Sequence, residues 1–309
     1  MANISAKDVA ELRKQTGIGM MECKKALVEA EGDFDAAIKL LREKGELKAA
    51  SKIANRIAAD GIVDIMKDGD LTAMIEVNSE TDFVAKNESF QEFVKNLLKT
   101  ILTAKPANVE ELMAAQYIEG GVTVDEKLKE EIFKIGEKLS IRRFALVEGL
   151  TATYIHGAGS IGVIVKFDTD CADKDGFAEF AKNIALQIGA YPTPYLTRND
   201  VPADVLESEK AIIKAQLAND PKMANKPEKV LEGIVMGKLG KFYEANCLVD
   251  MAYVKEDDMT VGQYVAKTAK ELGGNITIAS FCRFEKGEGI QKREEDFAAE
   301  IEKLAGGNK

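Results

Sequence analysis

The chain has 309 residues, 46% of them hydrophobic, and a formal net charge of −10. A chain of this length usually forms more than one core, so we expect two or three structural units. A net negative charge argues against a protein that mainly binds nucleic-acid phosphates. No apolar run approaches the roughly 18 residues of a membrane span, and the N-terminus lacks the layout of a signal peptide.

The four cysteines are scattered and form no Cys-x-x-Cys pair, a pattern that favours a reducing cytoplasm over a disulfide framework or a zinc site. The single histidine, His156, excludes metal sites built on several histidines. A Ser-His-Asp triad would depend on this one residue. The sequence therefore predicts a cytoplasmic protein with no metal, no cofactor and few options for catalysis.

Residues 1–55 are predicted to form a small three-helix docking module, like a UBA domain, followed by a helix-prone connector. Ser5 and Asp8 resemble a capping box at the start of the first helix. Asp33 caps the third helix, and Gly45 is expected to end it. The apolar residues predicted for the second helix are Met20, Met21, Cys23 and Leu27. Those predicted for the third helix are Phe34, Ala37, Ile38 and Leu41.

The stretch Gly17-Ile18-Gly19 lies between the first two predicted helices. A Gly-x-Gly pair binds phosphate when it follows a strand and is joined by a third glycine, and neither condition holds here. A tight turn between helices is therefore favoured. Met20 and Met21, next to this turn, suit either a core or an adaptable apolar contact, and Lys24 is expected on a solvated face.

Residues 56–149 are predicted to form the first half of a core. Two strands at 62–66 and 71–77 flank a turn that contains Asp68-Gly69, which indicates a β-hairpin. A helix is expected from Phe90 to Ala104, with further helices near 108–117 and 125–139 and a strand from Ile141 to Glu148.

The segment Thr81-Asp82-Phe83-Val84 lies between the second strand and the helix at Phe90. It allows two interpretations. Asp82 caps a helix while Phe83 folds back onto the core, or the segment is a projecting loop whose aromatic ring enters a partner. The local sequence leaves both open.

An internal repeat links the two halves of the chain. Phe90-Gln91-Glu92-Phe93-Val94-Lys95-Asn96 matches Phe177-Ala178-Glu179-Phe180-Ala181-Lys182-Asn183 at five of seven positions, and an apolar strand precedes each copy. The repeat predicts an α+β fold with a duplicated core, in which each half is an antiparallel sheet with helices on one face. The second half is assigned to 150–191 and 246–286.

Three features complete the second half. His156 lies in a glycine-rich hairpin turn, where a surface residue is favoured over a catalytic base. Prolines introduce an inserted helical hairpin at 192–245, with helices at 203–218 and 227–244. A C-terminal module at 287–309 is expected to contain a helix at 294–304. The apolar stripes predicted for the inserted hairpin are Ile212, Ile213 and Leu217, facing Val230, Leu231, Ile234, Val235, Leu239 and Phe242.

Several motifs together resemble the bacterial elongation factor Ts family, the guanine-nucleotide exchange factors of elongation factor Tu. The matching motifs, in chain order, are Leu12-Arg13-x-x-Thr16-Gly17-x-Gly19-Met20-Met21-x-Cys23-Lys24-Lys25-Ala26-Leu27, Glu76-Val77-Asn78-x-x-Thr81-Asp82-Phe83-Val84-Ala85-Lys86, Ile141-Arg142-Arg143, Tyr154-x-His156-Gly157 and Arg283-Phe284-x-x-Gly287-Glu288-Gly289-Ile290. Long motifs in this order over the whole chain are highly specific. The turn around His156 and the helical hairpin depart most from the family pattern.

The resemblance implies a function without bond chemistry. Residues Thr81 to Val84 would reach the GTPase domain of elongation factor Tu and disturb its magnesium site, so that GDP leaves and GTP reloads. Gly19, Met20, Met21 and Lys24 would contact the same domain, and His156 and the last helix would contact other surfaces of the partner. The oligomeric state stays open, with the helical hairpin as a candidate dimer surface.

Two other classes of function are compared with this one. An acid–base enzyme using Glu76, Glu80 and Asp82 would need these carboxylates in one pocket with shifted pKa values. An RNA-binding translation protein would need a basic, aromatic face, which an acidic chain with 6% aromatic residues disfavours.

Overall fold

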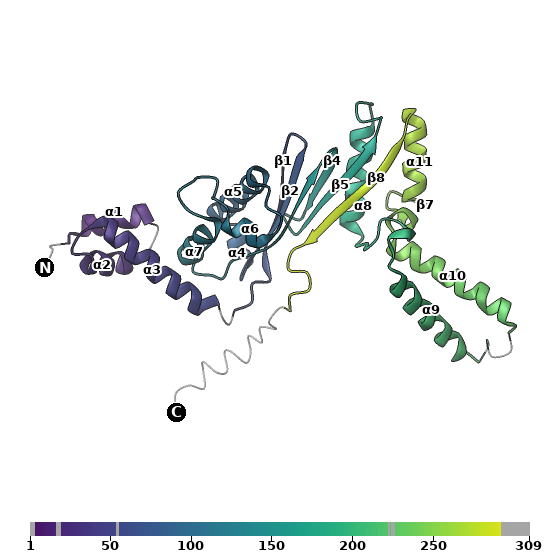
Figure 1. The fold of residues 1–309 in the computed structure, drawn as a ribbon, viewed down its shortest axis with the longest axis horizontal. Coiled ribbons are helices and arrows are strands. Elements are labelled where there is room, and N and C mark those ends of the chain that lie inside the picture. The colour runs from purple at the N-terminus through teal and green to yellow at the C-terminus, as the bar shows by residue number, and fades with distance from the viewer. Residues whose placement is uncertain (1–3, 17–19, 54–55, 222, 224–225, 292–309) are drawn as a thin grey trace. The chain divides into compact units, whose positions relative to one another are not determined.

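The computed structural model describes residues 4–16, 20–53, 56–221, 223 and 226–291, and it confirms the α+β class (Figure 1). The chain divides into two compact units. The first unit comprises Met1–Met66, Ala73–Leu146 and Glu285–Lys309. The second unit comprises Lys67–Thr72 and Val147–Phe284.

The predicted N-terminal three-helix module is confirmed. It consists of α1 (Ala6–Thr16), α2 (Met20–Glu29) and α3 (Phe34–Ile53). The predicted capping box begins α1, because the Asp8 N–H donates to Ser5 Oγ (3.2 Å) and the Ser5 N–H donates to Asp8 Oδ2 (2.9 Å). Asp33 caps α3 by accepting the Ala36 N–H at 3.0 Å. The core of the module contains Val9, Leu12, Cys23, Ala26, Leu27, Ala37 and Leu41.

The prediction that Gly45 ends the third helix is wrong, since α3 runs on to Ile53. A glycine inside a helix costs only about 1 kcal/mol relative to alanine. The residues that follow it, Glu46 to Ile53, are rich in good helix formers, so the helix and the predicted connector join into one element.

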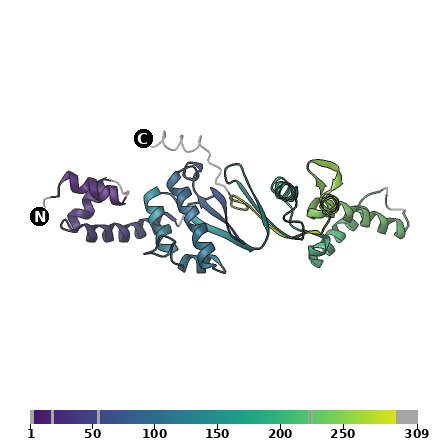
Figure 2. The ribbon, with the colours of Figure 1, turned by 90° about the horizontal axis from the view of Figure 1, so that it is seen from above.

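The first sheet has the strand order β1–β2–β3 and contains the predicted hairpin and the predicted third strand. Gly69 turns the hairpin with φ of +56°. The helices of this part lie on one side of the sheet (Figures 1 and 2). The elements are β1 (Asp60–Asp68), β2 (Leu71–Ser79), α4 (Asp82–Ala85), α5 (Glu88–Ala104), α6 (Val109–Ala114), α7 (Val124–Ile135) and β3 (Ser140–Glu148).

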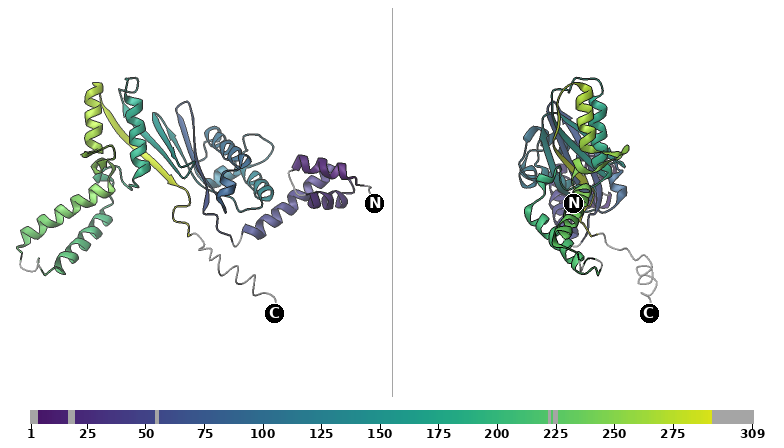
Figure 3. Two further views of the ribbon diagram at one scale, coloured as in Figure 1. Left: turned by 180° about the vertical axis from the view of Figure 1, so that it is seen from behind. Right: turned by 90° about the vertical axis from the view of Figure 1, so that its right-hand side faces the viewer.

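The second sheet has the strand order β4–β5–β8, and β4 pairs antiparallel with β5 from Thr151↔Lys166 to His156↔Ile161. Figure 3 shows α8 and α11 next to each other, and both contribute to the core beneath this sheet. The elements are β4 (Thr151–His156), β5 (Ile161–Thr169), α8 (Phe177–Ala190), β6 (Ala252–Tyr253), β7 (Glu256–Thr260), α11 (Val261–Leu272) and β8 (Ile276–Glu285). Two 3-10 turns, η1 (Arg198–Asp200) and η2 (Leu248–Asp250), flank the inserted helices.

The predicted duplication is visible in how α5 and α8 pack. Each helix follows a β-hairpin and buries the same three side chains of the repeated motif. In α5 these are Phe90, Phe93 and Asn96, and in α8 they are Phe177, Phe180 and Asn183. Residues spaced by three lie close together on a helix surface, so the repeat marks a buried face of each helix. In α8, Phe177 and Phe180 contact Phe167 of β5, and Asn183 donates to the hydroxyl of Tyr264 in α11.

The inserted hairpin consists of α9 (Ala203–Ala218) and α10 (Glu228–Asn246), which lie side by side in Figure 1. Its core is narrower than predicted. Ile213, Leu217, Val235 and Leu239 are buried there. Ile212 and Val230, which we predicted to pack inside, are 49% and 44% exposed. A two-helix hairpin buries only one stripe of each helix, so flanking apolar residues remain at the surface.

The predicted C-terminal helix at 294–304 lies outside the described residues. Within the described ranges, no helix combines the length and the apolar character needed to cross a membrane.

Candidate functional site

The segment Thr81 to Val84 forms the start of α4, a single helical turn after β2. Thr81 is the N-cap residue, with extended backbone angles of φ −125° and ψ 157°. The first interpretation of this segment is therefore wrong on two points. Asp82 is the first helical residue and not the cap, and Phe83 does not fold onto the core, because its exposed fraction is 78%. Its neighbour Val84 is buried instead, as expected when successive helical residues point about 100° apart.

The loop before α4 is anchored by side chains. The carboxylate of Glu137 accepts the Thr81 N–H at 3.1 Å and the Thr81 hydroxyl at 2.9 Å. Ser79, which is buried, donates its hydroxyl to the Thr81 carbonyl at 2.8 Å. On the far side of α4, the Gln91 side chain donates to the Ala85 carbonyl at 3.1 Å. A loop held in this way presents Phe83 in a fixed direction.

Charges surround the exposed ring. Lys86 donates to Asp82 at 2.6 Å, and its Nζ lies 5.8 Å from the centroid of the Phe83 ring. The hydrogen bond from Lys86 lowers the pKa of Asp82, so this carboxylate is ionised at neutral pH. The loop tip therefore combines a large apolar ring with a paired negative charge at the surface.

The three carboxylates of the enzyme alternative do not share one pocket. Glu76 is fully buried and bonded to Arg142 and Arg143. Glu80 accepts the Lys138 N–H and a guanidinium nitrogen of Arg56. Asp82 is exposed and paired with Lys86. Among the residues that the structure describes, no group of three His, Cys, Asp or Glu side chains could hold a metal ion.

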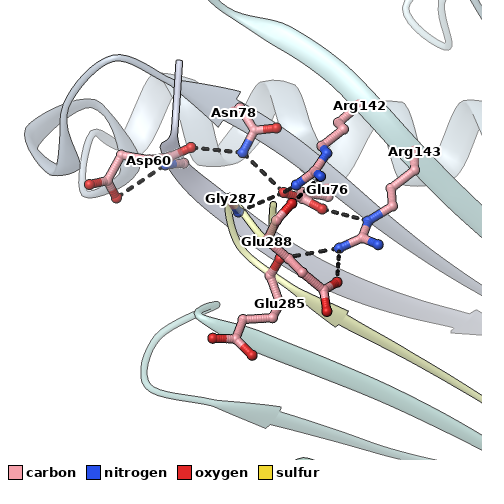
Figure 4. Close-up of polar contacts among 9 residues, drawn as sticks. Asp60, Glu76, Asn78, Arg142, Arg143, Glu285, Gly287 and Glu288 are labelled. Carbon is pink, nitrogen blue, oxygen red and sulfur yellow. Dashed lines mark hydrogen bonds and ion pairs between the residues drawn. The ribbon is translucent and has the colours of Figure 1, made fainter. Parts of the chain in front are cut away.

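Glu76 is the centre of the polar cluster drawn in Figure 4. Its Oε1 accepts hydrogen bonds from Arg142 Nη1 (2.9 Å), Asn78 Nδ2 (3.1 Å) and the Gly287 N–H (2.8 Å). Its Oε2 accepts from Arg143 Nε at 2.6 Å. Burial raises the pKa of Glu76, but these hydrogen bonds outweigh burial and leave the pKa below its ordinary value of 4.5.

The same cluster fastens the segment after β8 to the first sheet. Arg143 donates to the Glu285 carbonyl at 3.2 Å and to the Glu288 carboxylate at 3.0 Å, while Arg142 donates to the Glu288 carbonyl. Arg142 and Arg143 belong to one of the sequence motifs, but the sequence did not identify Glu76 as their partner. A charged residue inside an apolar strand was the available signal, because buried carboxylates need paired donors.

The predicted contact residues of the N-terminal module lie on the surface of α2. Met20 and Met21 are 48% and 66% exposed, and Lys24 is exposed. Gly19 lies outside the described residues. Val28, which the sequence did not single out, is 59% exposed and lies seven positions after Met21, on the same helix face. The two side chains therefore extend the exposed apolar surface of α2 along one face.

His156 ends β4 at the predicted hairpin turn and is exposed. Its Nδ1 lies 2.8 Å from the hydroxyl of Tyr154, and the two rings are 6.0 Å apart. Gly157, with φ of +55°, begins the turn. His156 belongs to the second unit, whereas the Thr81–Val84 loop and α2 belong to the first.

An exposed aromatic side chain on an anchored loop makes this segment a candidate for contact with another protein, because aromatic residues carry much of the energy of protein interfaces. The sequence profile of the family described as Elongation factor TS matches residues 80–288, which include this loop. An Elongation factor Ts of Clostridium kluyveri is 46% identical over 306 residues, covering 97% of this chain and 98% of the relative. One of Clostridium botulinum is 45% identical over 306 residues, with the same coverage. One of Syntrophotalea carbinolica is 42% identical over 301 residues, covering 96% of this chain and 98% of the relative. The chain belongs to the elongation factor Ts family of translation elongation factors.

Proposed function

We propose that this protein is a cytoplasmic guanine-nucleotide exchange factor for elongation factor Tu. It binds elongation factor Tu that carries GDP and promotes the release of GDP, so that GTP reloads. The observation that carries this proposal is the exposure of Phe83 at the tip of an anchored loop. Membership in the elongation factor Ts family supports elongation factor Tu as the partner.

In the proposed mechanism, Phe83 acts as a wedge. A bound magnesium ion and the backbone amides of a phosphate-binding loop hold the phosphates of a nucleotide by charge. A ring inserted among the elements that carry these groups displaces them, and Asp82 adds negative charge near the phosphates. The affinity for GDP falls, and by thermodynamic linkage GDP weakens the binding of the factor by the same ratio.

Contacts outside the loop would supply the binding affinity. On α2, Met20, Met21 and Lys24 present apolar and basic groups to solvent, and Gly19 precedes them in the sequence. His156, on the second unit, offers a separate polar contact. Contacts spread over both units suit the roughly 1,000 Å² or more that a specific interface buries. Phe83 would then change the rate of GDP release more than the strength of binding.

Replacement of Phe83 by alanine tests the wedge directly. We expect the variant to lose about 30-fold or more in the maximal rate at which it releases GDP, because large aromatic anchors contribute about 2 kcal/mol or more at interfaces. The measurement is stopped-flow release of a fluorescent GDP analogue from purified elongation factor Tu over a range of factor concentrations.

The matched control is Met236→Ala, which removes an exposed apolar side chain (66% exposed) from the inserted hairpin. We expect it to release GDP as fast as the parent. If Phe83→Ala is as fast as the parent, the wedge mechanism is wrong although the exchange function stands. If the parent itself does not accelerate release, the proposed function is wrong.

A further inference from the structure

The loop that carries Phe83 and the segment between α7 and β3 are joined by hydrogen bonds in both directions, because each of them provides a carboxylate that accepts from the other. Glu137 of that segment accepts both the N–H and the hydroxyl of Thr81, at 3.1 and 2.9 Å. In return, Glu80 of the loop accepts the N–H of Lys138. Two adjacent residues of the loop are therefore each bonded to one of two adjacent residues of the other segment. We call these four residues, Glu80, Thr81, Glu137 and Lys138, the reciprocal clamp.

A second set of contacts reinforces the clamp from the chain before β1. Arg56 Nη1 donates to both carboxylate oxygens of Glu80, at 3.2 and 3.1 Å. Lys138 Nζ donates to the Arg56 carbonyl at 2.9 Å. Three segments that are far apart in the sequence therefore meet directly under the first turn of α4.

Helix α4 depends on these contacts for its direction. It has only four residues, and a helix this short is not stable by itself. Thr81 makes no side-chain hydrogen bond to the helix that it caps, and its hydroxyl donates to Glu137. Val84 is the buried residue within α4, and Phe83 is 78% exposed. Burial of Val84 therefore attaches α4 to the core through one residue. The clamp fixes the orientation of the helix, and with it the direction in which the Phe83 ring projects into solvent.

We propose that Glu137 is a positioning residue for nucleotide exchange. It acts through Thr81, holding the first turn of α4 so that the Phe83 ring enters the partner in the productive direction. This inference rests on the proposed function. It assigns a role in exchange to a carboxylate that lies 56 positions from Thr81 in the sequence.

A double-mutant cycle tests the role of Glu137. The variants are Glu137→Ala, Phe83→Ala and the double variant, and the readout is the release of a fluorescent GDP analogue from elongation factor Tu. We expect Glu137→Ala to lower the maximal rate by about 10-fold, because a misplacement of about 1 Å in a reacting group has effects of this order or larger. The factor concentration at half-maximal rate should change less than about twofold.

The decisive comparison is the effect of Glu137→Ala when Phe83 is already absent. If Glu137 acts through Phe83, the second substitution lowers the remaining rate by less than about twofold. If it lowers the rate by the same factor in both backgrounds, Glu137 has a separate role and the proposal is wrong. Glu137→Gln keeps one acceptor oxygen for Thr81, so we expect it to retain at least about half of the parent rate.

Two further measurements separate the inference from the proposed function. Asp125→Ala removes a carboxylate from α7 that pairs with Lys129 and not with the loop, and we expect parent-like rates. Amide hydrogen exchange of residues 81–85 in the isolated protein should become at least about 10-fold faster in Glu137→Ala, with the amides of α5 unchanged. Unchanged exchange at 81–85 would overturn the clamp itself, whatever the GDP assay shows. A parent protein that releases no GDP would overturn the proposed function instead.

Discussion

Replacing Glu76 with alanine is expected to lower the free energy of unfolding by about 3–5 kcal/mol, the range found when one partner of a buried ion pair is removed. The Glu76 side chain is fully buried, and its two oxygens accept four hydrogen bonds. Alanine leaves two guanidinium groups, an amide side chain and the Gly287 N–H without this acceptor. Because the side chains of Arg142 and Arg143 are 27% and 30% exposed, water can solvate part of them, and we expect a value in the lower half of the range.

Urea denaturation followed by circular dichroism at pH 7 measures this effect, and hydrogen exchange at Gly287 locates it. The control is Glu244→Ala, which breaks an ion pair with Lys241 of 2.6 Å, the same N–O distance as in the Arg143–Glu76 pair. The side chains of Lys241 and Glu244 are both more than half exposed, so we expect Glu244→Ala to lower the free energy of unfolding by less than about 1 kcal/mol. If the two variants lose equal stability, burial of Glu76 does not have the importance that we assign to it.

The pH dependence of the parent provides an independent check on Glu76. The pKa of this group is lowered in the folded protein, so in the acid range the unfolded chain binds more protons, and stability rises with pH. Its contribution is fully present above the ordinary value of 4.5 and is lost as the pH falls through the lower folded pKa. The stability difference between the parent and Glu76→Gln should therefore shrink below about pH 4.5. A difference that stays constant down to pH 3 would contradict this assignment.

Much of the fold could be predicted from the sequence because its signals are local. Capping residues such as Ser5 and Asp33 mark where helices begin, and the repeated Phe-x-x-Phe-x-x-Asn pattern marks the buried face of two helices. Gly45 shows the limit of such signals. A glycine is compatible with both the end and the interior of a helix, and the helix-forming residues that follow it decide the outcome.

The candidate site was only partly predictable because its geometry depends on distant partners. Phe83 and Val84 are adjacent apolar residues, and nothing in the local sequence decides which of them faces the core. The anchor of the loop, Glu137, lies 56 positions from Thr81, and Arg143 lies 67 positions from Glu76. Periodicity and caps specify elements but not which element meets which, so these pairings needed the structure.

A second large effect is expected at Gly61, near the start of β1. Its φ of +119° lies in a region that is essentially restricted to glycine, and alanine there costs about 1–3 kcal/mol in backbone strain. A Cβ atom at this position would also overlap the backbone carbonyl oxygen of Val77 and lie 2.6 Å from the Asn78 Cα. Because these are backbone atoms of β2, the two strands would have to move apart. Overlap of this kind costs roughly a further 1–3 kcal/mol, so we expect the two effects together to lower the free energy of unfolding of Gly61→Ala by about 2–6 kcal/mol.

Gly120→Ala separates the overlap at Gly61 from the effect of a positive φ alone. Gly120 has φ of +77°, and no atom lies within 4 Å of the place where its Cβ would be. We expect Gly120→Ala to lower the free energy of unfolding by only about 1–2 kcal/mol in the same urea titration. Equal losses would show that β1 and β2 tolerate the extra atom. Because Val77 and Asn78 lead directly into Ser79 and Thr81, a real displacement of β2 also moves the base of the loop. Gly61→Ala should then slow the release of GDP from elongation factor Tu under conditions where the variant remains folded, whereas Gly120→Ala should not.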